Sequence, residues 1–462
     1  MKKIKYFGIG LLAINIFVSC SAEDLNPTQD SSIDPELIKT DTDARLVADA
    51  MYKSMRATAY YGRDFVIFDE VRSDNTFSSG SSGRFVTVGS MSLTNNDAYA
   101  GDTFSAIYKP IASANIVIAA SLTGDAAAIA QVKGEAYGIR ALCHFDLLKL
   151  FGQQFVSGQG GMNALGISYV KQFRSTDVYP ARGTVAQNKA DIYSDLDAAI
   201  ANLSPALNDT DAIRLTSYAA HALKSRVALY FGDWQIAKDE ANYVITNSGL
   251  SIVSSSTFVA SFTPTGTISN KLFMLKALAN DNNAINGLAN IYRGNSYGDI
   301  NVLQDLKNSF SALDVRGSAA MITIISGKLR NKGKYPTGSP NYNDNTIVMR
   351  YEEVVLNYAE ALFRLNPTDP EALTVLNSIT SKRSADPYTE VTEVNILLER
   401  RKELCFEGFR FSDLARTGKN IPLVSPTQQT HGGVNYGSYK YAFPIPIKEV
   451  NSNSSAIQNL GY

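Results

Sequence analysis

The chain has 462 residues, of which 45% are hydrophobic, so it can bury a sizeable core and could hold two or three average domains. Lys and Arg total 43 against 44 for Asp and Glu, which gives a formal net charge of -1. A chain this close to neutral has no broad positive field for nucleic acid or for an anionic membrane surface. Phosphate-tracking functions are therefore disfavoured.

The N-terminus has the pattern of a bacterial lipoprotein signal peptide, expected over residues 1–19. Three lysines lie among the first five residues, and residues 6–18 form an uncharged run that is too short to span a bilayer. The sequence FVSC at the end of this run resembles a lipobox, in which Cys20 carries the lipid anchor. The alternative is an ordinary secretory signal with an incidental cysteine. Residues 20–40 are rich in Ser, Thr and Asp and are expected to form a lipidated, flexible tether.

From Asp41 onward, most of the chain shows helical periodicity, with apolar residues three and four positions apart. The clearest repeat covers residues 216–248, where a Gly-Asp turn joins two amphipathic segments, and a second pair covers residues 355–379. Such pairs resemble tetratricopeptide hairpins, in which small residues let two helices pack closely. Pro110 falls inside another helical stretch and is expected to kink or split it. The sequence predicts a mostly α fold of helical hairpin repeats, with residues 41–462 as a single domain.

A charged stretch near the C-terminus, residues 397–416, reads LLERRKELCFEGFRFSDLAR. Alternating charges are usual on a solvated helix face, but here a cysteine and three phenylalanines interleave with them. Burying the rings would carry some of the charges inside, and a buried charge needs a partner. We therefore expect Arg400, Arg401 and Arg410 to pair with carboxylates and to pin other segments onto this one.

The same stretch resembles the ERRxELxFEGxRxxDLxR signature of the SusD/RagB family, the cell-surface nutrient-binding lipoproteins of gut and oral Bacteroidetes. The stretches FSAIYKPIASANIVI and GEAYGIRALCHFDLLKLFG and the ending YAFPIPIKEVNSNSSAIQNLGY are similar to further blocks of this family. The SAED after Cys20 is similar to the signal that sends such lipoproteins to the outer face of the outer membrane. The resemblance implies a SusD-like fold, an outward-facing lipid anchor in the outer membrane, capture of an oligosaccharide, and docking on a SusC-like TonB-dependent transporter.

Two irregular segments, at about residues 60–100 and 250–345, interrupt the helical pattern and are expected to form ligand-binding loops. Strand-like pieces lie near residues 272–277 and 320–325 of the second segment. Sugars present apolar C–H faces and paired hydroxyls, which suit exposed rings and planar polar side chains. The resemblance singles out these loops, because the family builds its ligand sites from irregular segments that cross the repeats. The predicted ligand-binding residues are Tyr60, Tyr61, Asp74, Asn75, Tyr292, Arg293 and Tyr297.

Little in the sequence indicates catalysis or a cofactor. Of the three histidines, His144 and His221 fall in helices assigned to packing, and no two histidines have a metal-ligand spacing. The glycine motifs of nucleotide-binding loops are absent from the sequence. Cys143 and Cys405 lie in apolar helical stretches and are expected to be buried free thiols, a disulfide between them being the alternative. We therefore expect no metal, no cofactor and no enzyme activity.

Three alternatives to glycan capture stay open from the sequence. The first is capture of oligopeptides by a RagB-like member of the same family. The second is a glycoside hydrolase, whose two carboxylates can come from anywhere in a chain, and the one acidic cluster considered for it is Asp69, Glu70 and Asp74. The third is a protein-interaction scaffold that binds the transporter but no small ligand.

Overall fold

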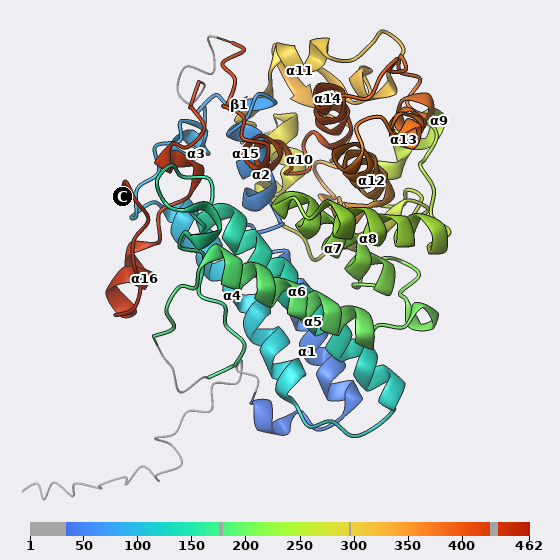
Figure 1. Ribbon diagram of the computed structural model, residues 1–462. Helices are drawn as coiled ribbons and strands as arrows, with labels where there is room; N and C mark the ends of the chain where they lie inside the picture. The colour runs from blue at the N-terminus through green and yellow to red at the C-terminus, as the bar shows by residue number, and fades with distance from the viewer. Residues whose placement is uncertain (1–33, 175–178, 295–296, 426–432) are drawn as a thin grey trace, which may run out of the picture. The chain divides into compact units, whose positions relative to one another are not determined.

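The computed structural model describes residues 34–174, 179–294, 297–425 and 433–462. The chain divides into two compact units, Met1–Leu37 and Ile38–Tyr462, which are described separately. In the first unit, Pro35–Leu37 forms a single 3-10 turn. The predicted signal peptide, Cys20 and most of the predicted tether lie outside the described residues, so these predictions stay untested. The second unit contains all the elements described below (Figure 1).

Four long helices make up much of the first half of the second unit: α1 (Asp41–Met55), α4 (Ala98–Ala119), α5 (Ala126–Phe151) and α6 (Val185–Asn202). They lie side by side in Figure 1, and each packs against the next in the order α1, α4, α5, α6. Capping boxes start two of them, Thr40 with Asp43 on α1 and Thr184 with Gln187 on α6. Helix α4 continues through Pro110 and is not split there as expected. Its packing between α1 and α5 holds it together despite the missing backbone donor.

The two predicted hairpins are confirmed. The first is α7 (Ser217–Phe231) followed by α8 (Trp234–Asn247), and the second is α12 (Tyr351–Leu365) followed by α13 (Pro370–Lys382). Gly232 ends α7 with φ 77°, a left-handed position that glycine adopts without strain. Helix α12 packs against both α8 and α13, so the hairpins stack on each other as in a helical repeat. The mostly α fold predicted from the sequence is therefore confirmed.

The segment expected to be a long loop, residues 60–100, is structured. It contains α2 (Asp64–Val71), the strand β1 (Thr76–Ser78) and the short α3 (Val86–Gly89). Every residue of α2 is buried, so this helix has no polar face and its sequence shows no three- and four-residue periodicity. The missing helical periodicity at residues 64–71 therefore reflects a helix that is buried on all sides and not a surface loop.

The second irregular segment alternates short helices and strands. Its elements are α9 (Ser255–Phe258), β2 (Lys271–Leu275), α10 (Leu288–Arg293), β3 (Ile300–Val302), α11 (Gln304–Asn308), β4 (Ile322–Ile325), β5 (Lys328–Asn331) and β6 (Thr346–Arg350). Among the described residues, the strands form three antiparallel pairs, β1–β3, β2–β6 and β4–β5. The strand pieces predicted near residues 272–277 and 320–325 correspond to β2 and β4. In the β1–β3 pair Thr76 lies opposite Val302, so the two irregular segments pair with each other.

The charged stretch near the C-terminus forms α14 (Glu393–Leu404) and α15 (Arg410–Arg416). Most of its charges are buried. Glu403 lies among three arginines, with nitrogen-to-oxygen distances of 2.7 Å to Arg350, 2.7 Å to Arg383 and 3.0 Å to Arg316. The prediction that these charges find partners inside the protein is confirmed.

The same stretch also pins distant segments, as predicted. Arg410 donates to both carboxylate oxygens of Asp74 at 2.6 and 2.8 Å, and Arg401 Nε donates to Asn75 Oδ1 at 2.9 Å. Arg400 pairs with a carboxylate of α15 at 3.0 Å. The region after α2 is therefore fastened to α14 and α15 by buried polar contacts.

The chain closes with an extended stretch and a short helix, α16 (Ile447–Ser452). Phe443 and Ile445 are buried, and the Phe443 amide donates to the Leu150 carbonyl at 2.7 Å. Pro444 and Pro446 exclude a regular helix in this stretch, and the hydrogen bond fixes it against the end of α5. Helix α16 begins directly after it, at Ile447.

Candidate ligand-binding site

Two of the predicted ligand-binding residues, Tyr60 and Tyr61, lie inside the protein. Their hydroxyls donate to the same oxygen of Asp146 at 2.7 and 2.8 Å. The pKa of both tyrosines lies well above its usual value, mainly because they are buried and also because the Asp146 carboxylate is close. The two side chains fix the start of the segment at residues 60–100 against α5, and in this conformation their rings are not open to a ligand.

Asp74 and Asn75 are also buried. Asn75 Nδ2 donates to Glu70 at 2.9 Å, while Asn75 Oδ1 accepts from Arg401. Burial alone would raise the pKa of Asp74, but Arg410 and Arg401 hold that pKa below its usual value. The polar atoms of both side chains are thus engaged within the fold.

The remaining predicted residues lie at and after the end of α10. Tyr292 is buried, and its ring stacks on Tyr335 with the ring centres 5.6 Å apart. The Arg293 guanidinium donates to the carbonyl of a nearby proline, and the guanidinium of Arg84 lies 3.5 Å from the centre of the Tyr297 ring. Arg293 and Tyr297 are half-buried, so these two alone of the seven predicted residues keep part of their surface. A role in ligand binding for any of the seven stays a prediction.

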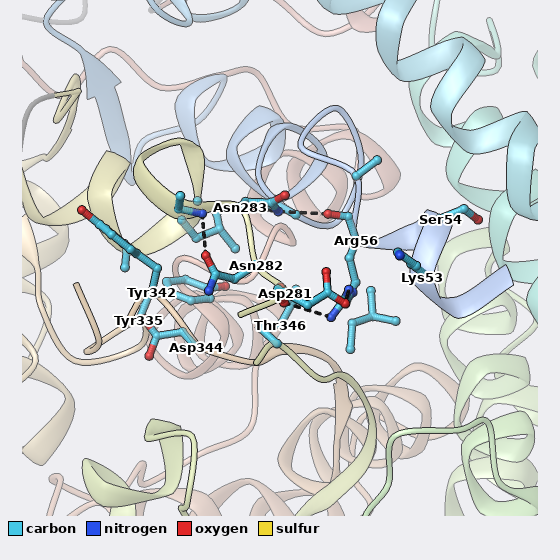
Figure 2. A pocket seen from close by; sticks show the side chains of 18 of the residues that line it. Lys53, Ser54, Arg56, Asp281, Asn282, Asn283, Tyr335, Tyr342, Asp344 and Thr346 are labelled. Carbon is cyan, nitrogen blue, oxygen red and sulfur yellow. Dashed lines mark hydrogen bonds and ion pairs between the residues drawn. The ribbon is translucent and has the colours of Figure 1, made fainter. Parts of the chain in front are cut away.

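A pocket of about 390 Å³ opens between the C-terminal end of α1, the loop at residues 277–287 and the loop at residues 335–346. Figure 2 shows Lys53 and Ser54 on one side of this pocket and Tyr342 and Asp344 on the other. Its polar lining residues are Lys53, Ser54, Arg56, Lys109, Asp281, Asn282, Asn283, Tyr335, Tyr342, Asp344 and Thr346. Alanines and two leucines complete the lining with apolar surface.

An ion pair links two walls of the pocket. Arg56 Nη2 lies 2.5 Å from Asp281 Oδ2, and Arg56 Nη1 donates to the Lys276 carbonyl at 2.6 Å. Asn283 Nδ2 donates to the Arg56 carbonyl at 2.9 Å. The end of α1 is thereby tied to a loop 225 residues later in the chain. The two walls are held at a fixed separation, as a preformed site requires.

Two further features shape the same walls. Asn282 Nδ2 donates to the Asn341 carbonyl at 3.2 Å and so joins the two loops. Gly62 packs so closely that a β-carbon there would lie 2.3 Å from both the Arg56 carbonyl oxygen and Asn283 Nδ2. A side chain at position 62 would therefore push the loop away from α1.

Asp344 is a pocket carboxyl that gains its charge near neutral pH. Burial raises its pKa to about 7. Two weaker effects act in the opposite direction: the Thr337 amide donates to both carboxylate oxygens at 2.9 Å, and Arg293 lies nearby. Tyr342 has φ 45°, a left-handed position that is unusual for an aromatic residue. Its ring is half-exposed. The loop thus presents a ring and a carboxyl that titrates in the physiological range.

The acidic cluster considered for hydrolysis lies in the core. Asp69 accepts from the Ser412 hydroxyl at 2.5 Å, and Glu70 accepts from the Gly408 amide at 3.0 Å. Burial raises the pKa of Glu70 to about 7. Asp74 is held by Arg410 as described above. Because all three carboxyls are buried and hydrogen-bonded, their positions give the hydrolase alternative no support.

Other residues singled out in the sequence are structural. His144 Nε2 accepts from the Val170 amide at 3.0 Å, its ring stacks on Tyr169 with the ring centres 3.7 Å apart, and burial lowers its pKa to about 3. Cys143 and Cys405 are buried free thiols, as expected. Within the part of the chain that the structure describes, no three potential metal ligands cluster, and no helix is both long and apolar enough to cross a bilayer.

Stacked helical hairpins that carry a polar pocket on their connecting segments define a class of helical-repeat proteins. In this class the repeats are the scaffold, and the insertions between them supply the ligand surface. Comparison with known families agrees with this assignment. Residues 25–229 match a family model described as "Starch-binding associating with outer membrane", and residues 246–462 match the "SusD family" model. The chain belongs to the SusD/RagB family.

Individual relatives match the whole chain or part of it. SusD-like protein P2 of Formosa agariphila is 24% identical over an alignment of 524 residues that covers 99% of each chain. Starch-binding protein SusD of Bacteroides thetaiotaomicron is 32% identical over 138 residues, which cover 29% of this chain and 24% of that protein. A crystal structure of a SusD superfamily protein from Bacteroides vulgatus has a TM-score of 0.82 at 26% identity and covers 92% of this chain and 100% of that chain. The family places this chain among carbohydrate-binding proteins associated with the outer membrane.

Proposed function

We propose that this protein captures an oligosaccharide at the cell surface and delivers it to a SusC-like TonB-dependent transporter. Cys20 carries the lipid anchor in this proposal, so the protein faces outward from the outer membrane. Family membership and the outer-membrane description of the matched model support this location. The proposal also includes binding without catalysis.

The pocket between α1 and the two loops is the observation that carries the proposal. Its volume of about 390 Å³ falls within the range of small-molecule sites. Hydroxyl, amide and charged side chains converge there beside apolar surface (Figure 2). A sugar presents hydroxyls and an apolar face together, so it can use both kinds of lining. Tyr342 adds a half-exposed ring on which a sugar ring can stack.

Two of the residues predicted from the sequence have an indirect part in this proposal. Tyr292 stacks on Tyr335, which lines the pocket. The carbonyl of Tyr61 accepts from the hydroxyl of Thr346 at 3.3 Å, and Thr346 is another lining residue. We assign Tyr61 and Tyr292 to the support of the pocket wall from behind, where they do not touch the ligand.

Binding without cleavage is argued from the pocket carboxylates. Glycoside hydrolysis needs two carboxyl groups on opposite sides of the scissile bond, one of them protonated. The lining residues of the pocket include two carboxyls, Asp281 and Asp344, and Asp281 is paired with Arg56. Asp344 therefore has no second unpaired carboxyl in the pocket lining with which to act. We expect a bound glycan to leave the protein unchanged.

The test is a binding screen of the full chain, purified in detergent, against plant and host glycans and mixed oligopeptides. Calorimetry reads binding, and product analysis follows every ligand that binds. A glycan that binds and is recovered intact supports the proposal, and co-purification with an outer-membrane transporter supports delivery. Peptide binding alone would indicate a peptide-capturing member of the family, and cleavage would indicate a hydrolase. Transporter binding with no small ligand would indicate a scaffold.

A further inference from the structure

A second hollow adjoins the pocket on the other side of the Arg56–Asp281 ion pair. It has a volume of about 270 Å³ and shares four lining residues with the pocket, namely Lys53, Arg56, Leu275 and Asp281. Tyr52, Ile213 and Arg214 are among the residues that complete it. The two adjacent hollows are together called the groove here, defined by the lining residues of both, and a chain-like ligand is long enough to contact the two.

Basic side chains outnumber carboxylates along this groove. The basic residues are Lys53, Arg56, Lys109, Arg214 and Lys276, and the acidic residues are Asp49, Asp281 and Asp344. The whole chain has a formal net charge of -1, so this excess is local and not a property of the protein as a whole. An excess of one sign of charge in a groove concentrates ligands of the opposite sign.

The arginines of the groove are already neutralised, but the lysines are not. Arg56 pairs with Asp281 at 2.5 Å, and Arg214 pairs with Asp49 at 2.9 Å. The lysines Lys53, Lys109 and Lys276 are exposed, and within the described ranges their ammonium groups form no ion pair. Three positive charges thus line the groove without a counter-charge from the protein.

The third carboxyl of the groove offsets these lysines only weakly. The Thr337 amide is shared between both carboxylate oxygens of Asp344, and burial raises the pKa of this carboxyl to about 7. At neutral pH this carboxyl is therefore protonated and uncharged in a substantial fraction of the molecules. The lysines of the groove thus stay available to an anionic ligand.

We infer that the groove binds an acidic oligosaccharide, whose carboxylate or sulfate groups contact Lys53, Lys109 and Lys276 while its hydroxyls face the remaining polar lining of the pocket. This inference rests on the proposed function, because the geometry specifies anionic groups and the proposal supplies the sugar chain that carries them. Uronate carboxylates and sulfate esters share the negative charge that the lysines recognise.

The test compares three probes by calorimetry with the full chain in detergent: short oligogalacturonates, chondroitin sulfate oligosaccharides and uncharged galacto-oligosaccharides. We expect at least one acidic probe to bind about tenfold more tightly than the uncharged probe. Its affinity should fall as sodium chloride is raised, since exposed charge pairs are screened by salt. Oligogalacturonates carry carboxylates alone, whereas chondroitin sulfate oligosaccharides carry both carboxylates and sulfate esters, so binding of the second probe alone would indicate recognition of sulfate.

A matched pair of variants locates the contacts. The variant that combines Lys53→Gln, Lys109→Gln and Lys276→Gln should lose about tenfold in affinity for the acidic probe, a larger loss than for the uncharged probe. The control combines Lys328→Gln, Lys382→Gln and Lys448→Gln, three exposed lysines outside both hollows that change the net charge equally. The control should bind like the wild type.

The outcomes separate this inference from the proposed function. If uncharged glycans bind as well as acidic ones, or if both triple variants behave alike, the acidic-ligand inference is overturned and glycan capture stands. If no glycan binds and oligopeptides do, the proposed function and the inference both fail.

Discussion

Arg410 holds both carboxylate oxygens of Asp74, 336 residues earlier in the chain, at 2.6 and 2.8 Å. Asp74 is buried and the Arg410 side chain is only 11% exposed, so water cannot replace either partner. Without Arg410, Asp74 would keep only Arg401, at 3.4 Å. We predict that Arg410→Ala lowers the free energy of unfolding by about 3–5 kcal/mol, measured by urea titration.

Arg401→Ala is the comparison for this prediction. Its removal leaves Asn75 without a donor, but Asp74 keeps both hydrogen bonds from Arg410. We expect a smaller loss of about 1–3 kcal/mol, because the carboxylate that Arg401 pairs with at 2.8 Å, Asp305, has a side chain that is 43% exposed and can be hydrated instead. An Arg410→Ala protein as stable as the wild type would contradict the account.

Glu403 provides a second stability prediction. Its carboxylate is fully buried among Arg316, Arg350 and Arg383, and their charges hold its pKa well below the usual value although burial alone would raise it. Glu403→Gln takes one buried ion-pair partner from each of the three arginines and should lower the unfolding free energy by about 3–5 kcal/mol. Glu390→Gln, at an exposed position, should change it by less than about 0.5 kcal/mol. Equal melting temperatures for the two variants would refute the prediction.

The pocket wall is tested at Gly62. An added β-carbon would meet the Arg56 carbonyl oxygen and Asn283 Nδ2 at 2.3 Å each, so the wall must shift. We expect Gly62→Ala to cost about 1–3 kcal/mol of stability and to weaken binding of any pocket ligand. Gly101→Ala is the control, because its β-carbon would meet only Pro446 Cβ, at 4.0 Å. Ligand affinity measured by calorimetry should fall for the first variant only.

The helical scaffold could be predicted from the sequence, because its signals are local. The hairpin of α7 and α8 shows in apolar spacing and in the turn at Gly232, and the pairing of Arg400 and Arg410 was inferred from the rings between them. Helix α2 was missed for a physical reason: it is buried on every side and has no polar face from which a period could be read.

The pocket could not be predicted in the same way. Arg56 and Asp281, which link two of its walls, are 225 residues apart, and no local pattern marks either residue. The rings and polar residues chosen from the sequence, such as Tyr60 and Asn75, were selected by residue type. Residue type does not reveal burial, and the fold uses these side chains for packing and internal hydrogen bonds.

Asp344 gives the site a pH dependence with a definite sign. Its pKa is raised from 3.8 to about 7 by burial, so the folded state binds a proton more tightly than the unfolded state does. The contribution of Asp344 to the free energy of unfolding therefore falls as the pH rises from 3.8 towards about 7.

Ionisation of Asp344 also adds a negative charge to the groove, so affinity for an acidic glycan should drop about threefold between pH 6 and pH 8. Calorimetry at the two pH values measures this drop, and Asp344→Asn should abolish it. A variant with the same drop as the wild type would rule out this carboxyl as its origin.

The most direct test of the account is the affinity of Tyr342→Ala for whichever glycan binds the wild-type protein most tightly, with Tyr436→Ala as the control. Tyr342 lines the pocket, whereas Tyr436 is 40% exposed and lies outside it. Loss of ring stacking should weaken binding about tenfold in Tyr342→Ala, with unchanged affinity in Tyr436→Ala. Equal affinities for the two variants would contradict the assignment of this pocket as the glycan site.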